Sequence, residues 1–168
     1  FTINAIYADI NGRIFDPTNG LPDLKIGKLK FIGSPNERIE EDYIRILRYF
    51  RFFLQYSKVD HDLDVIKYIK QHINGLNKIS KERIFDELLK ILKLTNILDL
   101  FKNIESKEIF INIFPQCKFY ERLKNFNNLN EKLIKCYDHK LILALLLVDQ
   151  TDNYEFFCYK YKTSNNIK

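Results

Sequence analysis

The stretch Glu-Asp-Tyr-Ile-Arg-Ile-Leu-Arg-Tyr-Phe-Arg-Phe-Phe, residues 41 to 53, decides how the middle of the chain folds. A helix that turns about 100° per residue gathers its apolar side chains on one side and its charges on the other. We therefore expect one amphipathic helix over residues 35–56. Its apolar side carries Tyr43, Ile46, Leu47, Phe50, Phe53 and Leu54, and its polar side carries Glu41, Arg45, Arg48 and Arg51, with Asp42 on the flank beside Arg45.

The polar side of this helix has two interpretations. A carboxylate beside a guanidinium offers acceptors and planar, fork-shaped donors, which can read the hydrogen-bonding edge of a base. Alternatively, Glu41 and Arg45 form an i,i+4 ion pair on a solvated face, which stabilises a helix modestly. These residues alone leave both interpretations open.

Residues 1–33 carry the strand-like patterns of the chain. Asn11-Gly12 is the strongest short-range hairpin signal, and it separates two runs rich in β-branched and aromatic residues. We expect this hairpin to be the last one of a larger sheet, because an isolated two-stranded hairpin is marginal in water. The expected strands cover residues 2–10, 13–15 and 30–32, and a brief helix over 23–29 follows the breakers Pro17, Gly20 and Pro22.

After residue 33 the hydrophobic pattern is helical nearly throughout. Ser34, Pro35 and Glu37 read as a helix start with a capping box, and Asp62-Leu63-Asp64 opens a second helix. Further helices are expected over residues 61–73, 80–93, 95–103, 106–113, 117–126, 129–137, 139–149 and 152–161, with Ser80, Thr95 and Ser106 as N-caps.

Composition favours a nucleic-acid partner and a reducing compartment. The net charge is +5, from 27 basic and 22 acidic residues, so folding must assemble any basic surface. Cys117, Cys136 and Cys158 are odd in number and lack metal-type or paired spacing, so we expect a cytoplasmic protein without a metal site built from them. The longest apolar run, residues 141–148, is well short of the roughly 20 residues of a membrane span, so no membrane is expected.

Four blocks of sequence stand in a particular order. They are Phe-Thr-Ile-Asn-Ala at 1–5, Asp-Pro-Thr-Asn-Gly-Leu-Pro-Asp-Leu at 16–24, the segment 31–52 from Phe-Ile-Gly-Ser-Pro to Arg-Tyr-Phe-Arg-Phe, and Ile-Ser-Lys-Glu-Arg-Ile at 79–84. In this order and spacing they resemble the class II tRNA nucleotidyltransferase/poly(A) polymerase family. The resemblance implies a mainly α fold: the C-terminal end of an α/β nucleotidyltransferase head with its β-hairpin at 1–33, an all-helical neck with the nucleotide-selection helix at 34–95, and a helical RNA-binding body at 96–168.

The resemblance also implies roles for single residues. Thr2 and Asn4 match positions that contact the sugar or phosphates of the incoming nucleotide, although strand alternation would also explain them. Glu41, Asp42, Arg45 and Arg48 match the motif that recognises CTP or ATP, and Asp16, Gly20 and Asp23 match the hinge between head and neck. Arg38 and Arg51 either contact phosphate or only solvate the helix. Arg83, in the motif that begins at Ser80, either braces the neck or contacts RNA.

The chemistry implied is metal-assisted phosphoryl transfer. The 3′-hydroxyl of an RNA, such as a tRNA 3′ end, would attack the α-phosphate of CTP or ATP with Mg²⁺ bound by an Asp-x-Asp pair. In the family that pair precedes the segment found here at residue 1, and the look-alikes Gly33-Ser34 and Asp62-Leu63-Asp64 are helix starts. Because the chain also contains no Met and begins with Phe1, we expect a piece of a longer protein that is inactive alone.

Three functions are compatible with these residues. The chain is part of an RNA 3′-end nucleotidyltransferase, for tRNA CCA addition or polyadenylation, whose catalytic head lies upstream or on a separate chain. Alternatively, it is a non-catalytic helical module that binds tRNA or another RNA. The third possibility is an inactive remnant of a broken gene.

Overall fold

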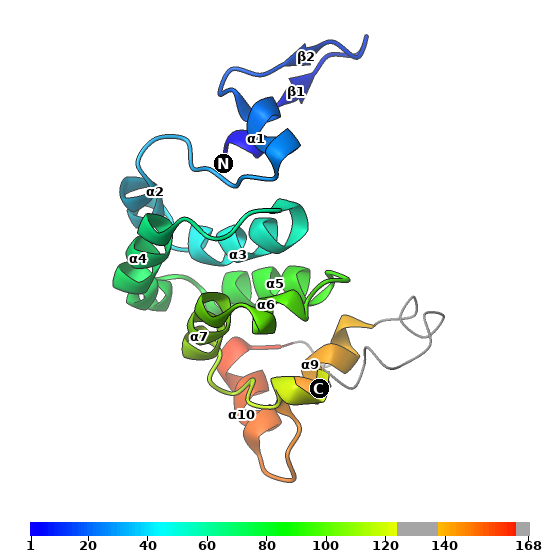
Figure 1. Cartoon of the computed structure of the whole chain (residues 1–168). Helices are drawn as coiled ribbons and strands as arrows, with labels where there is room; N and C mark the ends of the chain where they lie inside the picture. The colour runs from blue at the N-terminus through cyan, green and yellow to red at the C-terminus, as the bar shows by residue number, and fades with distance from the viewer. Residues whose placement is uncertain (124–137, 164–168) are drawn as a thin grey trace. The chain divides into compact units, whose positions relative to one another are not determined.

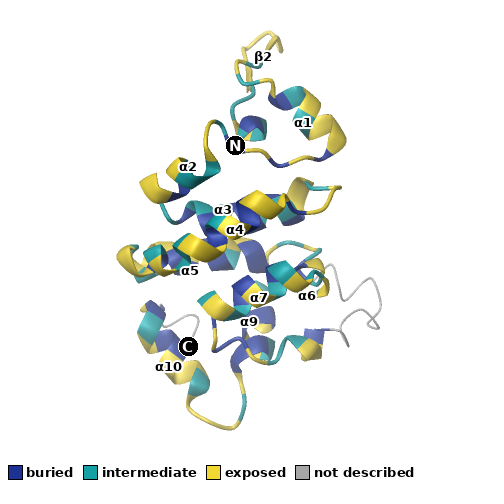
Figure 2. Cartoon of the chain, turned by 60° about the vertical axis from the view of Figure 1, so that its left-hand side comes forward, coloured by how far each residue is buried: buried dark blue, intermediate teal, exposed yellow. Residues whose placement is uncertain are grey.

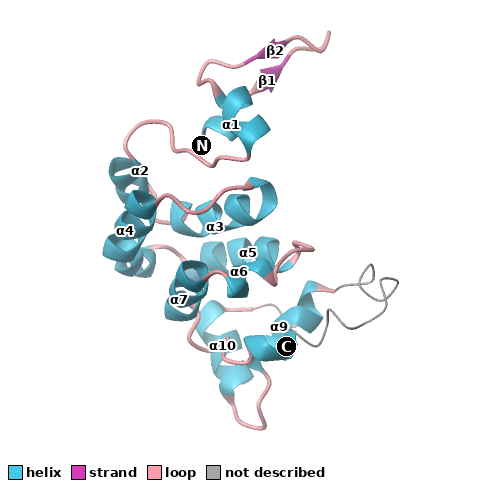
Figure 3. Cartoon of the chain, viewed as in Figure 1, coloured by secondary structure: helices cyan, strands magenta, loops and turns pink. Residues whose placement is uncertain are grey.

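The computed structural model describes residues 1–123 and 138–163 (Figure 1). Within these ranges the regular structure is helical apart from one short hairpin (Figure 3). The mainly α fold with a small β-hairpin is therefore confirmed. The chain divides into two compact units, Phe1–Lys78 and Ile79–Lys168. The domain boundaries expected near residues 33 and 95 stay predictions.

The hairpin expected at Asn11-Gly12 is present in the first unit. Strand β1 (Tyr7–Ala8) pairs antiparallel with β2 (Ile14–Phe15), so that the first residue of β1 faces the last residue of β2. The turn is held by the Asp9 carboxylate, which accepts two backbone N–H groups, and by Gly12, which adopts φ +79°. Both strands are exposed to solvent (Figure 2).

Residues 2–4 form a short 3-10 turn, η1 (Thr2–Asn4), in place of the expected strand. The backbone N–H of Thr2 donates to the carbonyl of Lys30 at 3.0 Å, and its hydroxyl donates to Asp23 at 2.7 Å. These two bonds hold Thr2 against Lys30 and Asp23, so residues 2–4 do not extend the hairpin strand. The strand expected over residues 30–32 is also wrong, because Lys30 forms this bond in a loop.

Helix α1 (Gly20–Ile26) begins earlier than expected because the carboxylate of Asp16, just before it in the chain, caps it. Asp16 accepts the backbone N–H groups of Leu21 and Gly20 at 2.8 and 2.7 Å, which satisfies donors that a helix N-terminus leaves free. These bonds lower the pKa of Asp16. Position 20 requires glycine, since a Cβ there would lie 2.2 Å from the carbonyl oxygen of Thr2. The expected hinge motif is thus a tightly bonded turn.

The single helix expected over residues 35–56 is broken in two. Helix α2 (Pro35–Glu41) ends at Asp42, which is extended with φ −154°, and α3 (Arg45–Tyr56) follows a short turn. On one continuous helix Ile44 would lie about 140° around the axis from Ile39. In the structure both side chains are buried, at 1% and 0% exposure. The break therefore buries an apolar side chain that a straight helix would turn away from the core.

Of the two N-terminal caps expected in the first unit, one forms and one does not. Asp62 precedes α4 (Leu63–His72) as expected, and its carboxylate accepts the backbone N–H of Asp64 at 3.0 Å. The helix continues into the 3-10 segment η2 (Ile73–Lys78). Ser34 precedes α2, but its side chain makes no capping hydrogen bond, so the expected capping box is not formed.

Aromatic rings around α3 fill the core of the first unit. Tyr49 is 1% exposed, and its hydroxyl lies 3.0 Å from Nδ1 of His61. Phe53 stacks on His61 with ring centroids 3.5 Å apart, and Phe31 stacks on Tyr49. This packing covers α3 on most sides, so its arginines occupy the side that the core leaves partly open.

The second unit is a group of packed helices. Helix α5 (Lys81–Leu92) packs against α9 (His139–Leu147) and α10 (Asn153–Tyr161), while α6 (Asp99–Lys102) packs against α7 (Ile104–Ile113). Its core holds the buried aromatic side chains Phe85, Phe110, Phe114, Phe157 and Tyr161.

Of the three N-caps expected in the second unit, Ser80 is confirmed, whereas Thr95 and Ser106 are wrong. Ser80 caps α5 as expected, because its hydroxyl accepts the backbone N–H of Arg83 at 3.4 Å. Thr95 lies in a turn, and Asn103 in place of Ser106 caps α7 through a 2.9 Å bond. The helix expected over 117–126 is described only as a 3-10 turn at 120–123, and the helix expected over 129–137 lies outside the described residues.

Candidate functional site

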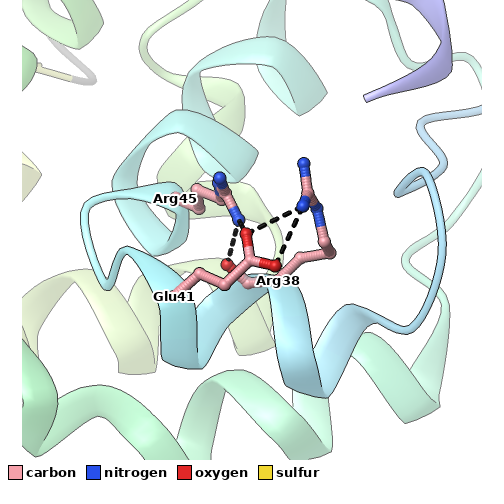
Figure 4. Close-up of polar contacts among 3 residues, drawn as sticks. All are labelled: Arg38, Glu41 and Arg45. Atoms are coloured by element: carbon pink, nitrogen blue, oxygen red, sulfur yellow. Dashed lines mark hydrogen bonds and ion pairs between the residues drawn. The ribbon is translucent and has the colours of Figure 1, made fainter.

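Charged side chains meet at the break between α2 and α3. Arg38 and Glu41 belong to α2, and Arg45 is the first residue of α3. Nη1 of Arg38 lies 2.9 and 2.8 Å from the two carboxylate oxygens of Glu41, and Nη1 of Arg45 lies 2.6 Å from Oε2. Figure 4 shows the Glu41 carboxylate between the two guanidinium groups. We call the break between α2 and α3, residues 42–44, the joint, and these three charged residues the joint cluster.

Arg45 also holds the two helices together. Its Nη1 donates to the backbone carbonyl of Arg38 at 2.5 Å. That carbonyl lies in the last turn of α2, where carbonyl groups lack partners within the helix and a positive charge is favourable. Arg45 therefore caps α2 from the helix that follows it.

The joint cluster is partly open to solvent. The side chains of Arg38, Glu41 and Arg45 are 40%, 48% and 23% exposed. The hydrogen bond from Arg45, supported by the bond and charge of Arg38, lowers the pKa of Glu41, so that its carboxylate is ionised at neutral pH. These contacts by themselves are also what the ion-pair interpretation requires.

The arginines of the joint cluster keep hydrogen-bond donors for another partner. Each contacts Glu41 through Nη1, and in the described part of the chain Nε and Nη2 of both have no hydrogen-bond partner. A guanidinium presents its N–H groups in one plane. A flat ligand edge with acceptors can therefore bind them while Glu41 remains in place.

Asp42 occupies the break itself. It is half-buried, and its backbone carbonyl accepts the N–H of Arg45 at 2.9 Å. The expectation that Asp42 and Arg45 stand on one continuous helix is wrong, because α2 ends at Asp42. The expected contact between Glu41 and Arg45 forms across this break.

Arg48 and Arg51 continue from Arg45 at three-residue steps, a spacing that aligns side chains along a helix. All three are half-buried. The guanidinium of Arg51 lies over the ring of Phe52, 4.1 Å from its centroid. The side chain of Arg48 has no hydrogen bond or ion pair among the described residues. This arginine strip leads away from the joint cluster along α3.

The first residues of the chain lie near the joint cluster. Burial, followed by the charges of Arg38 and Arg45, lowers the pKa of the Phe1 amino group. Asn4 is exposed, whereas Thr2 is 4% exposed and its hydroxyl is bonded to a carboxylate on α1. Thr2 thus has a structural role here, and nucleotide contacts by Thr2 and Asn4 stay predictions.

Arg83 belongs to the second unit. It is exposed in the first turn of α5, directly after the Ser80 cap. Its contact with RNA stays a prediction. Sequence reasoning missed Gly75, which packs against Tyr43 in the break. Gly75 falls between the helices expected over residues 61–73 and 80–93, where a glycine indicates only a turn, so no sequence signal pointed to this close approach.

The Asp-x-Asp sequence at Asp62 is a helix start in the structure. Across residues 1–123 and 138–163, no group of three or more His, Cys, Asp or Glu side chains could hold a metal ion. Cys117 and Cys158 are buried free thiols, and Cys136 lies outside the described residues. Within the same ranges, none of the helices has the length and apolar character needed to cross a membrane.

Comparisons with known proteins agree on one family. Residues 62–120 match the family described as "Probable RNA and SrmB- binding site of polymerase A". Over its whole length the chain is similar to the CCA-adding enzyme of Streptococcus uberis, with 30% identity across 42% of that enzyme. Together, these matches support a fragment of the tRNA nucleotidyltransferase/poly(A) polymerase family.

Other members of the family match part of the chain at higher identity. The human mitochondrial CCA tRNA nucleotidyltransferase 1 is 46% identical over 93 residues, which are 54% of this chain and 21% of the human protein. The CCA-adding enzyme of Streptococcus pyogenes is 43% identical over 94 residues, 55% of this chain and 23% of that enzyme. The chain thus matches between 21% and 42% of the length of these relatives.

Proposed function

We propose that this chain supplies nucleotide selection and RNA binding to an RNA 3′-end nucleotidyltransferase, which adds CCA to tRNA or poly(A) to RNA from CTP and ATP. The joint cluster carries the proposal. Its carboxylate aligns two guanidinium groups whose outer donors remain unused, and it falls on the residues that resemble the family's selection motif.

Cytosine and adenine share the feature that such a cluster would read. Each carries an amino donor beside a ring-nitrogen acceptor, whereas uracil and guanine carry a carbonyl acceptor beside a ring N–H. A free donor of Arg45 matches the ring acceptor, and the carboxylate of Asp42 or Glu41 matches the amino group. Uracil or guanine would set acceptor against acceptor and donor against donor, so the cluster would select CTP and ATP.

The arginine strip and the second unit would bind phosphates. Arg48 and Arg51 extend the positive charge along α3, where guanidinium groups suit phosphate oxygens. The matched region 62–120, whose family description names RNA binding, includes the exposed Arg83. We propose a tRNA 3′ end as the RNA, because the similar proteins are named CCA-adding enzymes or CCA tRNA nucleotidyltransferase.

The chemical step is proposed to need a separate catalytic head. The family implies Mg²⁺, but the carboxylate of Asp62 caps a helix and the described residues offer no metal-binding group of side chains. This part of the chain therefore does not fit a Mg²⁺ site. We expect the metal ligands on a head that is carried upstream or by another chain. A non-catalytic RNA-binding module is the second candidate, favoured by the match over residues 62–120.

Equilibrium binding tests both candidates. The dissociation constants of CTP, ATP, UTP and GTP are measured for the 168-residue chain, together with that of a tRNA lacking its terminal CCA. Our proposal expects tighter binding of CTP and ATP, and tRNA binding that weakens with salt. Binding of tRNA without any preference among nucleotides would support the RNA-binding module instead, and binding of neither ligand would contradict both.

A further inference from the structure

The side of the joint opposite the joint cluster is packed against η2. Tyr43 lies in the break, and its ring fills the space beside Gly75. A Cβ at position 75 would lie 2.2 Å from Cδ1, 2.3 Å from Cε1 and 2.5 Å from Cγ of Tyr43. Lys78 places its Nζ 5.5 Å from the centroid of the same ring. Only glycine fits here unless the tyrosine ring moves.

The end of α4, which leads directly into η2, also contacts α2. Nε2 of His72, at the end of α4, lies 2.7 Å from Oδ1 of Asn36 and 3.5 Å from Oε1 of Glu40. At 100° per residue, Asn36 and Glu40 lie on one side of α2, and Arg38 and Glu41 lie on the other. One side of the joint is therefore held by α4 and η2, while the other side presents the joint cluster.

A displacement of Tyr43 would also displace Arg45, because backbone hydrogen bonds connect the break to the first turn of α3. The backbone N–H of Ile46 donates to the carbonyl of Tyr43 at 3.1 Å, and the N–H of Arg45 donates to that of Asp42 at 2.9 Å. The Arg45 side chain is held at 2.5 and 2.6 Å from its two partners on α2. Ordinary van der Waals contact begins at 3.4 Å, so relieving the 2.2 Å contact requires the ring to move by more than about 1 Å. In a catalytic site, a misplacement of about 1 Å can lower the rate roughly a hundredfold.

We propose that Gly75 and Tyr43 are positioning residues, whose close contact sets the direction of α3 against α2 and thereby the placement of Arg45 beside Glu41. The consequence for nucleotide choice rests on the proposed function. The placement of Arg45 does not, and it can be measured separately.

The decisive variant is Gly75→Ala in the 168-residue chain, and Asn74→Ala is its matched control in an exposed neighbour on η2. The first readout is the side-chain Nε–H signal of Arg45 in ¹⁵N–¹H NMR spectra. We expect Gly75→Ala to shift this signal and Asn74→Ala to leave it unchanged. An unmoved Arg45 signal in folded Gly75→Ala would overturn the proposal.

The second readout is the preference for CTP and ATP over UTP and GTP. We expect Gly75→Ala to lower it by about tenfold or more, and to have less than about a twofold effect when Tyr43→Ala has already removed the ring. An equal effect in both backgrounds would show that Gly75 does not act through Tyr43. A shifted Arg45 signal in a chain whose unmodified form has no preference would contradict the proposed function and leave the positioning role intact.

If Gly75→Ala does not fold, Tyr43→Leu replaces it, because this change removes ring contacts without adding an atom at position 75. It must then shift the Arg45 signal. An unshifted signal in folded Tyr43→Leu would refute the positioning role as well.

Discussion

Arg45→Ala separates base reading from a structural ion pair. The side chain is 23% exposed and donates to Glu41 at 2.6 Å and to the carbonyl of Arg38 at 2.5 Å. A hydrogen bond from a charged group contributes about 1.5–3 kcal/mol when well buried, and solvent screening reduces this to about 1 kcal/mol here. We therefore expect the melting temperature to fall by roughly 2–4 °C in a chain of this size.

The loss of nucleotide preference should exceed this loss of stability. Removing one partner of a matched donor and acceptor set costs about 1–3 kcal/mol, or roughly five- to 150-fold in discrimination. We expect both Arg45→Ala and Asp42→Ala to reduce the preference for CTP and ATP by a factor in this range. The ion-pair interpretation instead expects lower stability with an unchanged preference.

Calorimetric titration with the four nucleoside triphosphates and a melting curve for each variant measure the two quantities. Arg13→Ala is the matched control, because Arg13 is an exposed arginine beside the hairpin turn. A chimera that joins this chain to the part of the Streptococcus uberis CCA-adding enzyme outside the matched region adds relative incorporation of the four nucleotides as a further measure. If Arg45→Ala and Asp42→Ala both retain the preference in binding and incorporation, base reading by this cluster is refuted.

With Mg²⁺ and CTP or ATP, the 168-residue chain alone should add no nucleotide to RNA, because the Asp62 carboxylate caps a helix; incorporation of labelled nucleotide by the pure protein would contradict this. Gly20→Ala should lower the free energy of unfolding by about 1–3 kcal/mol, since the new Cβ would lie 2.2 Å from a backbone carbonyl. Gly33→Ala, where nothing lies within 4 Å and only φ +81° opposes alanine, should cost about 1 kcal/mol, so a smaller effect at position 20 in urea unfolding would count against the packing argument. Asp16→Asn tests the hydrogen bonds that lower the pKa of Asp16: the carboxylate stabilises the fold above its unfolded pKa of about 3.9, and this stabilisation is lost as the pH falls through the lower folded-state pKa. The melting temperatures of wild type and Asp16→Asn should therefore converge as the pH is lowered below about 4, and a gap independent of pH would argue against this role.

Features that depend on neighbouring residues could be predicted from the sequence. The Asp62 and Ser80 caps form as expected, because each satisfies a free backbone N–H only two or three residues away. The hairpin forms at Asn11-Gly12 because glycine adopts positive φ without strain. The expected strand over Thr2 failed for the opposite reason, since its partners on α1 and at Lys30 are far along the chain.

The joint could not be predicted from the helical pattern. The sequence from Glu41 to Arg45 contains no proline or glycine, and a periodic reading carries the helix straight through it. The break follows from the burial of Ile44 and from the packing of Tyr43 against Gly75, which only a folded chain brings together. Local propensity yields to tertiary packing at such a point.

By itself the sequence determined the helical class, the hairpin, and the set of charged residues among which a nucleotide site had to be sought. The sequence also offered the Glu41–Arg45 ion pair as one interpretation. Only the tertiary structure decided that its two partners stand on separate helices, with Arg38 as a second cation and α4 and η2 behind them. The physical reason is geometric. Side-chain direction changes by about 100° with each helical residue, so one short break redirects every residue after it, and the contacts that set the break lie elsewhere in the chain.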